Sequence, residues 1–255
     1  MGAETVELML TLKGSASKMR YVVKFSKESE IKFISHLDLM RTVQKIIKRS
    51  ALPIEYSKGF NPHMSLSFAQ PLAVGVYSFG EYMDINLNEE LDEQYIINAL
   101  NCNAPAGIKF HKAVKLVQNG EKKVPKSMAG VEGAAYKIEI RYKDVTGLEN
   151  QMKILEKQNN WVTIKKSKSS ENEVDIKPMF KELKYSISDN KLIVKALVSC
   201  GSRENLSPEL IASFIKDNTT GADFDAFVDI VREETYGKFN EKYIPLHEYL
   251  KSFSR

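Results

Sequence analysis

The chain has 255 residues, of which 43% are hydrophobic and 27% charged, a balance typical of a globular protein and unlike that of a disordered one. The formal net charge of +4 is too small to indicate nucleic-acid binding by itself. The two cysteines, Cys102 and Cys200, form no CxxC or CxxxCxxC motif, which argues against a disulfide framework, a zinc finger or an iron–sulfur cluster. We therefore expect reduced thiols in the cytoplasm, no metal and no cofactor.

The hydropathy pattern gives no indication of a membrane segment. No apolar run approaches the roughly 20 residues that span a bilayer. The first residues lack the basic region and apolar run of a secretory signal. We interpret 1–18 as an upstream extension or a cloning remnant, and we expect no contact with a membrane.

The first half of the chain predicts an alternation of strands and helices. Met19–Ser26 is rich in β-branched and aromatic residues and predicts a strand. Ser35 can cap a helix that begins near Leu37, and Arg41 and Lys45 lie on its polar face. Two strands, a helix and a last strand are expected at 64–68, 80–87, 91–100 and 107–117. This strand–helix–strand–strand–helix–strand order is that of a ferredoxin-like unit, an antiparallel sheet with two helices on one face.

The second half predicts the same order without any repeat of sequence. A hairpin is expected around Asp189 and Asn190, and Ser207 followed by proline predicts the start of a helix. The other strands and the other helix are expected at 135–142, 161–166, 227–233 and 148–158. The sequence thus predicts an α+β fold of two ferredoxin-like units, 19–118 and 134–255, joined by a basic linker at 119–133.

Charge is distributed unevenly along the chain. Residues 20–63 contain nine Lys or Arg and four acidic residues, whereas 70–106 contains six acidic residues and no Lys or Arg. Residues 107–128 contain six Lys and one Glu. Such blocks create a field that steers an anionic partner, or they are ordinary solvated surface, and the sequence leaves both readings open.

The octapeptide at 56–63, YSKGFNPH, is the most unusual part of the segment 33–84. Gly59 permits a positive φ, so backbone N–H groups can form an anion nest beside Lys58. Tyr56 and Phe60 offer stacking surfaces, and basic residues interleaved with aromatic ones are what single-stranded nucleic acid needs. The alternative is a simple β-turn in which Phe60 plugs a hydrophobic gap.

Two histidines of this segment are weak candidates for catalysis. His36 lies at a helix start, but Asp38 is two residues away and does not face it, so the two make a poor catalytic pair. His63 follows the octapeptide turn as a loop residue. Arg41 either pairs with Asp38 or offers its planar fork to a phosphate. The candidate binding residues are Asp38, Arg41, Lys45, Tyr56, Ser57, Lys58, Gly59, Phe60, Asn61 and Glu81.

The segments FISHLDLMR and LPIEYSKGFNPHMSLSFAQPLAVGVYSFGEYMDI resemble the bacterial radical-SAM-linked domain family, which is typically fused to a radical-SAM protein or encoded beside one. The resemblance covers about Met19 to the C-terminus and is more specific in the first half. It implies a stand-alone accessory form, because this chain lacks the CxxxCxxC that holds the radical-SAM cluster. No catalytic residues carry over, because no activity is established for the family. The motif positions are His36, Asp38, Arg41, Tyr56, Ser57, Gly59, Phe60, Asn61, Pro62, His63, Gly75, Gly80 and Glu81.

Three functions are compatible with these observations. The first is a binding module that presents transfer or ribosomal RNA to a partner enzyme, as the distant likeness to RNA-binding RAMP proteins also implies. The second is an RNA-processing enzyme that uses His36 or His63. The third is an adaptor for a radical-SAM protein that docks through the acidic region 70–106. We expect a binding module rather than a self-sufficient enzyme, and the sequence makes no prediction of oligomeric state.

Overall fold

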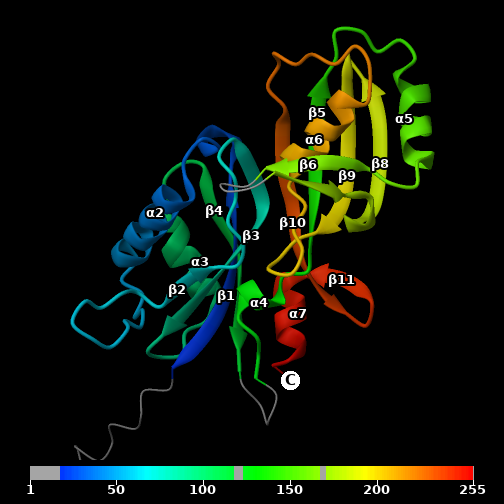
Figure 1. The fold of residues 1–255 in the computed structure, drawn as a ribbon. Helices are drawn as coiled ribbons and strands as arrows, with labels where there is room; N and C mark the ends of the chain where they lie inside the picture. The colour runs from blue at the N-terminus through cyan, green and yellow to red at the C-terminus, as the bar shows by residue number, and fades with distance from the viewer. Residues whose placement is uncertain (1–17, 118–122, 167–170, 255) are drawn as a thin grey trace, which may run out of the picture.

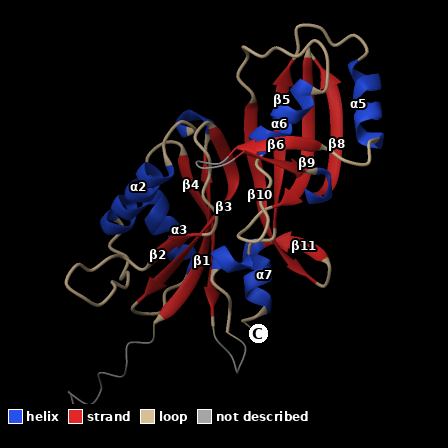
Figure 2. Ribbon diagram, viewed as in Figure 1, coloured by secondary structure: helices blue, strands red, loops and turns tan. Residues whose placement is uncertain are grey.

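The computed structural model describes residues 18–117, 123–166 and 171–254. Within these ranges the chain forms six α-helices, two short 3-10 helices and eleven strands. Nine of the strands make one sheet, and the other two form a separate hairpin (Figures 1 and 2). The expected α+β class is confirmed as a large, mostly antiparallel sheet packed with helices. The interpretation of 1–18 as an extension falls almost entirely outside the described residues.

The first half contributes four strands, two α-helices and a 3-10 turn. Its elements are β1 (Met19–Lys27), η1 (Ser29–Ile31), α2 (His36–Arg49), β2 (Leu66–Phe68), β3 (Val76–Leu87), α3 (Glu93–Cys102) and β4 (Ile108–Leu116). The strand order is β4-β1-β3, and β2 pairs with β3. The Ser35 hydroxyl accepts the N–H of Asp38, so α2 begins where the sequence predicts.

Alternate residues of β1 face two different cores. Tyr21 and Val23 pack with Leu39 and Val43 of α2, which places α2 and α3 on one face of the sheet. Val22 points to the opposite face and belongs to the core that contains the second half. The sheet of the first half is therefore buried on both sides.

The second half places five strands in the large sheet: four lie in the order β10-β5-β9-β8, and β11 pairs with β10. Asp189 and Asn190 both have positive φ, 50° and 57°, which confirms the expected tight hairpin between β8 and β9. The elements are α4 (Ser127–Gly130), β5 (Gly133–Arg141), α5 (Leu148–Lys157), β6 (Val162–Lys166), β7 (Glu171–Asp175), η2 (Lys177–Met179), β8 (Phe180–Ser188), β9 (Lys191–Ser199), α6 (Pro208–Asp217), β10 (Asp229–Phe239), β11 (Lys242–Pro245) and α7 (Leu246–Ser252).

Two expectations for the second half need correction. The strand expected at 161–166 does not join the large sheet, because its partner is β7, which comes from the polar segment that follows it. Trp161 anchors this hairpin, since its ring is buried between Phe180 and Phe214. The C-terminal pair β11 and α7 follows the last predicted strand and was not expected.

The linker expected at 119–133 is partly built into the fold. Residues 118–122 lie outside the described residues, but Ser127 is buried at the start of α4. Its N–H and hydroxyl both donate to Asp84 of β3, over 2.9 Å and 2.7 Å. Arg20 of β1 donates to Asp84 as well and to the carbonyls of Val124 and Pro125. The end of the linker is thus fixed to the first half.

The two halves are joined where β3 runs parallel to β10 for three residues, 76–78 against 230–232. Gly80 lies just beyond this pairing, and a Cβ there would approach the Glu234 Cα to 2.4 Å. Glycine is therefore required for the two strands to pass each other. No helix in the described ranges is long and apolar enough to cross a membrane.

Candidate functional site

The outer face of α2 carries a basic stripe made of Arg41, Lys45 and Lys48. The three side chains are exposed and follow the i, i+4, i+7 spacing of one helix face. Arg41 donates through Nη1 to Asp38 over 3.1 Å, an exposed i,i+3 ion pair that contributes little to stability. Hydrogen bonds from Ser35 and Arg41 lower the pKa of Asp38, so this carboxylate stays charged. Lys45 and Lys48 form no hydrogen bond or ion pair with a described residue, so their ammonium groups are available to an anionic partner.

Residues 56–63 form a protruding finger loop. Every one of its residues is exposed, and the loop projects away from the body of the first half (Figure 1). Two bonds close its base: the Ser57 N–H donates to the His63 carbonyl, and the His63 N–H donates to the Ser57 hydroxyl. Gly59 has a φ of 130°, as the sequence predicts for this turn. Phe60 is 107% exposed, so it does not plug a hydrophobic gap.

The loop and the start of α2 have separate contacts. The His36 ring packs edge-on against Phe68 at the end of β2, with ring centroids 5.4 Å apart. No hydrogen bond, ion pair or ring contact among the described residues joins His36 or Asp38 to the finger loop. Neither the His36 nor the His63 ring has a hydrogen-bonding partner within the described chain, and a catalytic base is normally oriented by one.

Glu81 lies in the interior, and this corrects its assignment as a binding residue. It is 3% exposed and accepts from the buried Arg232 of β10, with Nε–Oε1 at 2.8 Å and Nη2–Oε2 at 2.6 Å. Burial alone lowers the pKa of Arg232, but the charge and hydrogen bond of Glu81, together with Tyr136 and Cys200, outweigh this effect and raise it. The pair connects β3 to β10, so Glu81 stabilises the junction of the halves.

Half of the six acidic residues in 70–106 pair with a basic residue, namely Glu81, Asp84 and Glu90. Asp84 pairs with Arg20, and Asp92 caps α3 by accepting the N–H of Tyr95. Glu90 pairs with the Lys115 ammonium, and Glu93 accepts the Lys115 N–H. The other three acidic residues, Glu89, Asp92 and Glu93, form no ion pair with a described residue.

A second buried network connects β1, β3, β10 and α7. The Tyr82 hydroxyl lies 2.9 Å from both the Glu234 carboxylate and the His247 Nδ1. Because a carboxylate can only accept, Tyr82 donates to Glu234, and His247 donates from Nδ1 to the Tyr82 oxygen. Lys24 donates to the other Glu234 oxygen over 2.6 Å. Burial, with Lys112 and Lys24 nearby, lowers the pKa of His247 to about 4.

Another buried cation positions the segment before α2. Lys27 of β1 is 1% exposed, and its ammonium donates to the carbonyls of Lys32, Ile34 and Val76. Burial lowers the pKa of Lys27, and Glu81 opposes that effect. The bonds hold Phe33 against Phe227 of the second half, with ring centroids 5.7 Å apart. Residues 33–36 (FISH) therefore begin at the junction of the two halves, where Phe33 contacts Phe227, whereas the finger loop projects from another part of the first half.

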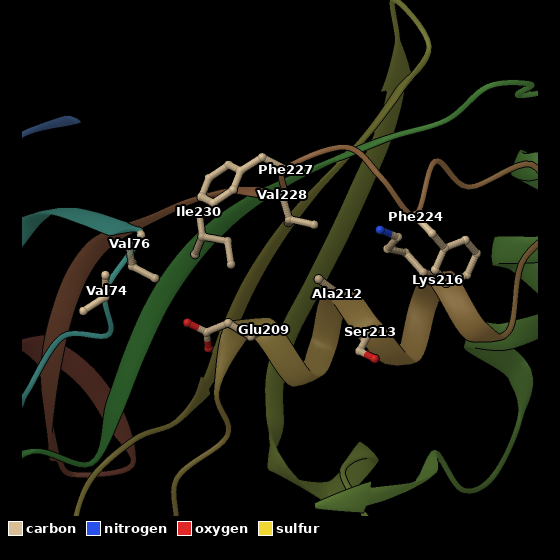
Figure 3. Close-up of a pocket in the computed structure, with 11 residues that line it drawn as sticks. Val74, Val76, Glu209, Ala212, Ser213, Lys216, Phe224, Phe227, Val228 and Ile230 are labelled. Carbon is tan, nitrogen blue, oxygen red and sulfur yellow. The ribbon is translucent and has the colours of Figure 1, made fainter. Parts of the chain in front are cut away.

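A pocket of about 280 Å³ opens at this junction (Figure 3). Its walls come from the loop before β3, from α6 and from the segment that leads into β10, and they include Val74, Ala212, Lys216, Phe224, Phe227 and Ile230. The sequence reasoning missed this site. The available signal was a pair of phenylalanines, Phe224 and Phe227, in a polar stretch between a helix and a strand. Across the described residues, no group of three or more His, Cys, Asp and Glu could hold a metal ion.

The fold and its buried junction define a mixed α/β protein built on one continuous, mostly antiparallel sheet. The chain belongs to a bacterial family described as "Uncharacterized protein conserved in bacteria (DUF2344)", whose sequence profile matches residues 20–208. The matched range contains the basic stripe, the finger loop and Glu81, and it ends at the first residue of α6. The expectation of a bacterial family of unknown function is confirmed. No curated protein matches the chain.

Similarity to solved structures is low. A chain of a Cbf5–Nop10–Gar1 complex is 11% identical with a TM-score of 0.48; the match covers 91% of this chain and 54% of that chain. This chain therefore spans about half the length of that relative. A protein of unknown function from Galdieria sulphuraria is 15% identical with a TM-score of 0.24, and covers 86% of this chain and 99% of its own. A mutant chlorite dismutase from Candidatus Nitrospira defluvii is 12% identical with a TM-score of 0.26, at 96% and 98% coverage. Scores this low carry no argument about function.

Proposed function

We propose that this chain is an accessory module that binds single-stranded RNA, such as the unpaired loops of transfer or ribosomal RNA. The observation that carries the proposal is Phe60, a large apolar ring fully exposed at the tip of the finger loop, next to Lys58. An exposed ring contributes nothing to the core, but it can stack on any base, because every base has a π-face. Tyr56, 43% exposed at the base of the same loop, offers a second stacking surface.

The basic stripe supplies the electrostatic part of the proposal. Successive members of the stripe are separated by about 6 and 4.5 Å along the axis of α2. Phosphate contacts give affinity without sequence preference, and stacking on the finger loop adds to them. Phosphate contacts by the basic stripe and base stacking by the finger loop together suit a module that holds RNA without reading its sequence and presents it to another protein.

The proposal extends to the architecture of each half. With β11 set aside, four strands of each half lie in the order fourth, first, third, second along the chain: β4-β1-β3-β2 and β10-β5-β9-β8. This is the order of a ferredoxin-like unit, so we interpret the protein as two such units joined through β3 and β10. The likeness to RAMP proteins rests on this fold analogy alone.

The motif shared with radical-SAM-linked domains supports a partnership with a radical-SAM protein in the cytoplasm. Cys102 and Cys200 are unpaired, as expected in a reducing compartment. In such a pair the partner would supply the cluster, and this chain would supply the RNA surface. Histidine catalysis is less well supported, because the His36 and His63 rings have no orienting partner among the described residues.

Replacement of the basic stripe tests the electrostatic contribution. Arg41, Lys45 and Lys48 are changed together to Gln, and binding of a fluorescent oligouridine is followed by anisotropy. Loss of three phosphate contacts should lower the slope of log affinity against log salt by about 2, at roughly 0.7 per contact on a single strand. The matched control removes three exposed lysines of the second half, Lys153, Lys157 and Lys181, and should leave the slope unchanged.

Phe60→Ala tests the stacking contribution. RNA affinity should fall roughly 5- to 150-fold, since stacking on an aromatic side chain contributes about 1–3 kcal/mol per base. Thermal stability should not change, because the ring is fully exposed. Phe239→Ala removes another exposed ring, from the end of β10, and serves as the control. Absence of RNA binding at low salt, or equal losses in the two variants, would reject the proposal.

A further inference from the structure

The pocket at the junction of the halves combines a buried apolar floor with an apolar rim that contacts water. Ala212 and Ile230 of the floor are 3% and 4% exposed. Val74, Phe224 and Phe227 of the rim are 58%, 64% and 53% exposed. The volume of about 280 Å³ lies at the small end of the range for ligand pockets. A rim of three large apolar side chains around a concave floor is a surface suited to a small apolar body.

Lys216 gives this pocket a charge that no group in the described chain neutralises. It is only 8% exposed, yet its ammonium forms no hydrogen bond or ion pair with any described residue. The nearest recorded partner is the Phe224 ring, whose centroid is 4.8 Å from Nζ. Figure 3 shows the amine directed from α6 toward Val228, across the pocket. Among the described residues no fully buried side-chain nitrogen lacks a partner, so the Lys216 ammonium must reach the open pocket, where its N–H donors are available to an anion.

The other polar side chains of the pocket limit what can enter with that anion. Glu209 lies seven residues before Lys216 on the same helix, about 10 Å away along its axis, and it also lines the pocket. It is exposed and has no partner among the described residues, so it disfavours a second anionic group at its end. Ser213 is already bonded to Asp217 over 3.2 Å. The charges therefore fit a ligand with one anionic group, located at the Lys216 end.

We propose that this pocket binds a small molecule with a flat apolar body and a single anionic group. The body lies on the rim between Phe224 and Phe227, and the anion is bound by the Lys216 ammonium. Phe227 is held in place from the other half, because Phe33 packs against its ring and the Lys32 ammonium lies 4.7 Å from its centroid. Both halves therefore shape the site. This inference is independent of the RNA proposal and uses none of the finger loop or the basic stripe.

The test compares two probes that share one ring system. The first, 8-anilinonaphthalene-1-sulfonate, has a flat apolar body and one anionic group, and N-phenyl-1-naphthylamine is the same body without the sulfonate. Both fluoresce on entering an apolar site. The full chain should bind the sulfonate probe saturably at one site. Lys216→Met keeps the apolar stem and removes the charge, so affinity for the sulfonate probe should fall at least about tenfold while affinity for the uncharged probe is kept.

Three controls make the outcome decisive. Phe227→Ala removes a wall and should weaken both probes, whereas Phe239→Ala, outside the pocket, should weaken neither. Lys153→Met removes an exposed lysine from α5 and should have no effect on either probe. Circular dichroism melts of each variant separate lost binding from lost folding, because a partly unfolded chain binds these dyes non-specifically.

Equal sulfonate affinity in the wild type and Lys216→Met would overturn the proposal, and so would equal losses in Phe227→Ala and Phe239→Ala. Sulfonate binding that falls as protein concentration rises, with a dimer seen by light scattering, would identify a second copy of the chain as the occupant and would also overturn it.

Discussion

The ion pair between Glu81 and Arg232 offers the strictest test of how the halves are held together. Both side chains are almost fully buried, at 3% and 2% exposure, and they connect β3 to β10 across 151 positions of sequence. Glu81→Gln removes the charge with little change of volume. It leaves the Arg232 guanidinium without a counter-charge, and the buried Lys27 ammonium also loses the favourable field of Glu81.

The expected cost of Glu81→Gln is about 3–5 kcal/mol, the usual effect of breaking a buried pair by removing one partner. Arg232→Met should cost less, because the Glu81 carboxylate then remains near the Lys27 ammonium. The double variant should be less destabilised than the sum of the two single changes, since it leaves no unpaired member of the couple. The two single changes differ in expected cost because the cluster of Lys27, Glu81 and Arg232 contains two cations and one anion.

Urea unfolding followed by two signals measures these costs. Far-UV circular dichroism reports on both halves, and fluorescence of the single tryptophan, Trp161, reports on the second half alone. The two transitions should coincide in the wild type. Asp38→Asn, which breaks an exposed pair that is screened by solvent, is the control and should cost far less than Glu81→Gln. A cost for Glu81→Gln no greater than that of Asp38→Asn would refute the reasoning.

Three further predictions concern other parts of the fold. The pKa of His247 is lowered from 6.5 to about 4, so the folded state favours the neutral ring, and its contribution to stability is present above pH 6.5 and lost as the pH falls toward 4. Between about pH 7.5 and pH 4.5 the wild type should lose about 2–3 kcal/mol of unfolding free energy more than His247→Gln, and urea titrations with parallel pH profiles would contradict this. Gly80→Ala should destabilise by about 1–3 kcal/mol or more in thermal melts, because its Cβ would meet the Glu234 backbone; an unchanged melting temperature would mean that the strands separate easily. Ser207→Ala removes the hydroxyl that accepts the Leu210 N–H and should cost about 1 kcal/mol in urea, whereas Ser207→Asp should retain most of the stability.

The local elements of this protein could be predicted from the sequence because their causes are local. Ser35 and Ser207 cap α2 and α6 through N–H groups three residues away. Asp189 and Asn190 tolerate positive φ, which makes the turn between β8 and β9. The protruding loop at 56–63 is likewise indicated by its own glycine and proline content. In each case the deciding contacts lie within a few residues of the chain.

Only the tertiary structure decided which residues of the motif are available to a partner and where the halves meet. Glu81 and Phe60 belong to one sequence motif, but Glu81 is buried against Arg232, which lies 151 residues further along the chain, whereas Phe60 is fully exposed. The pocket around Lys216 exists because β10 pairs with β3 and brings Phe227 against Phe33. Sequence patterns report on neighbours three or four positions apart, whereas a parallel strand pairing between distant segments depends on the packing of the whole chain.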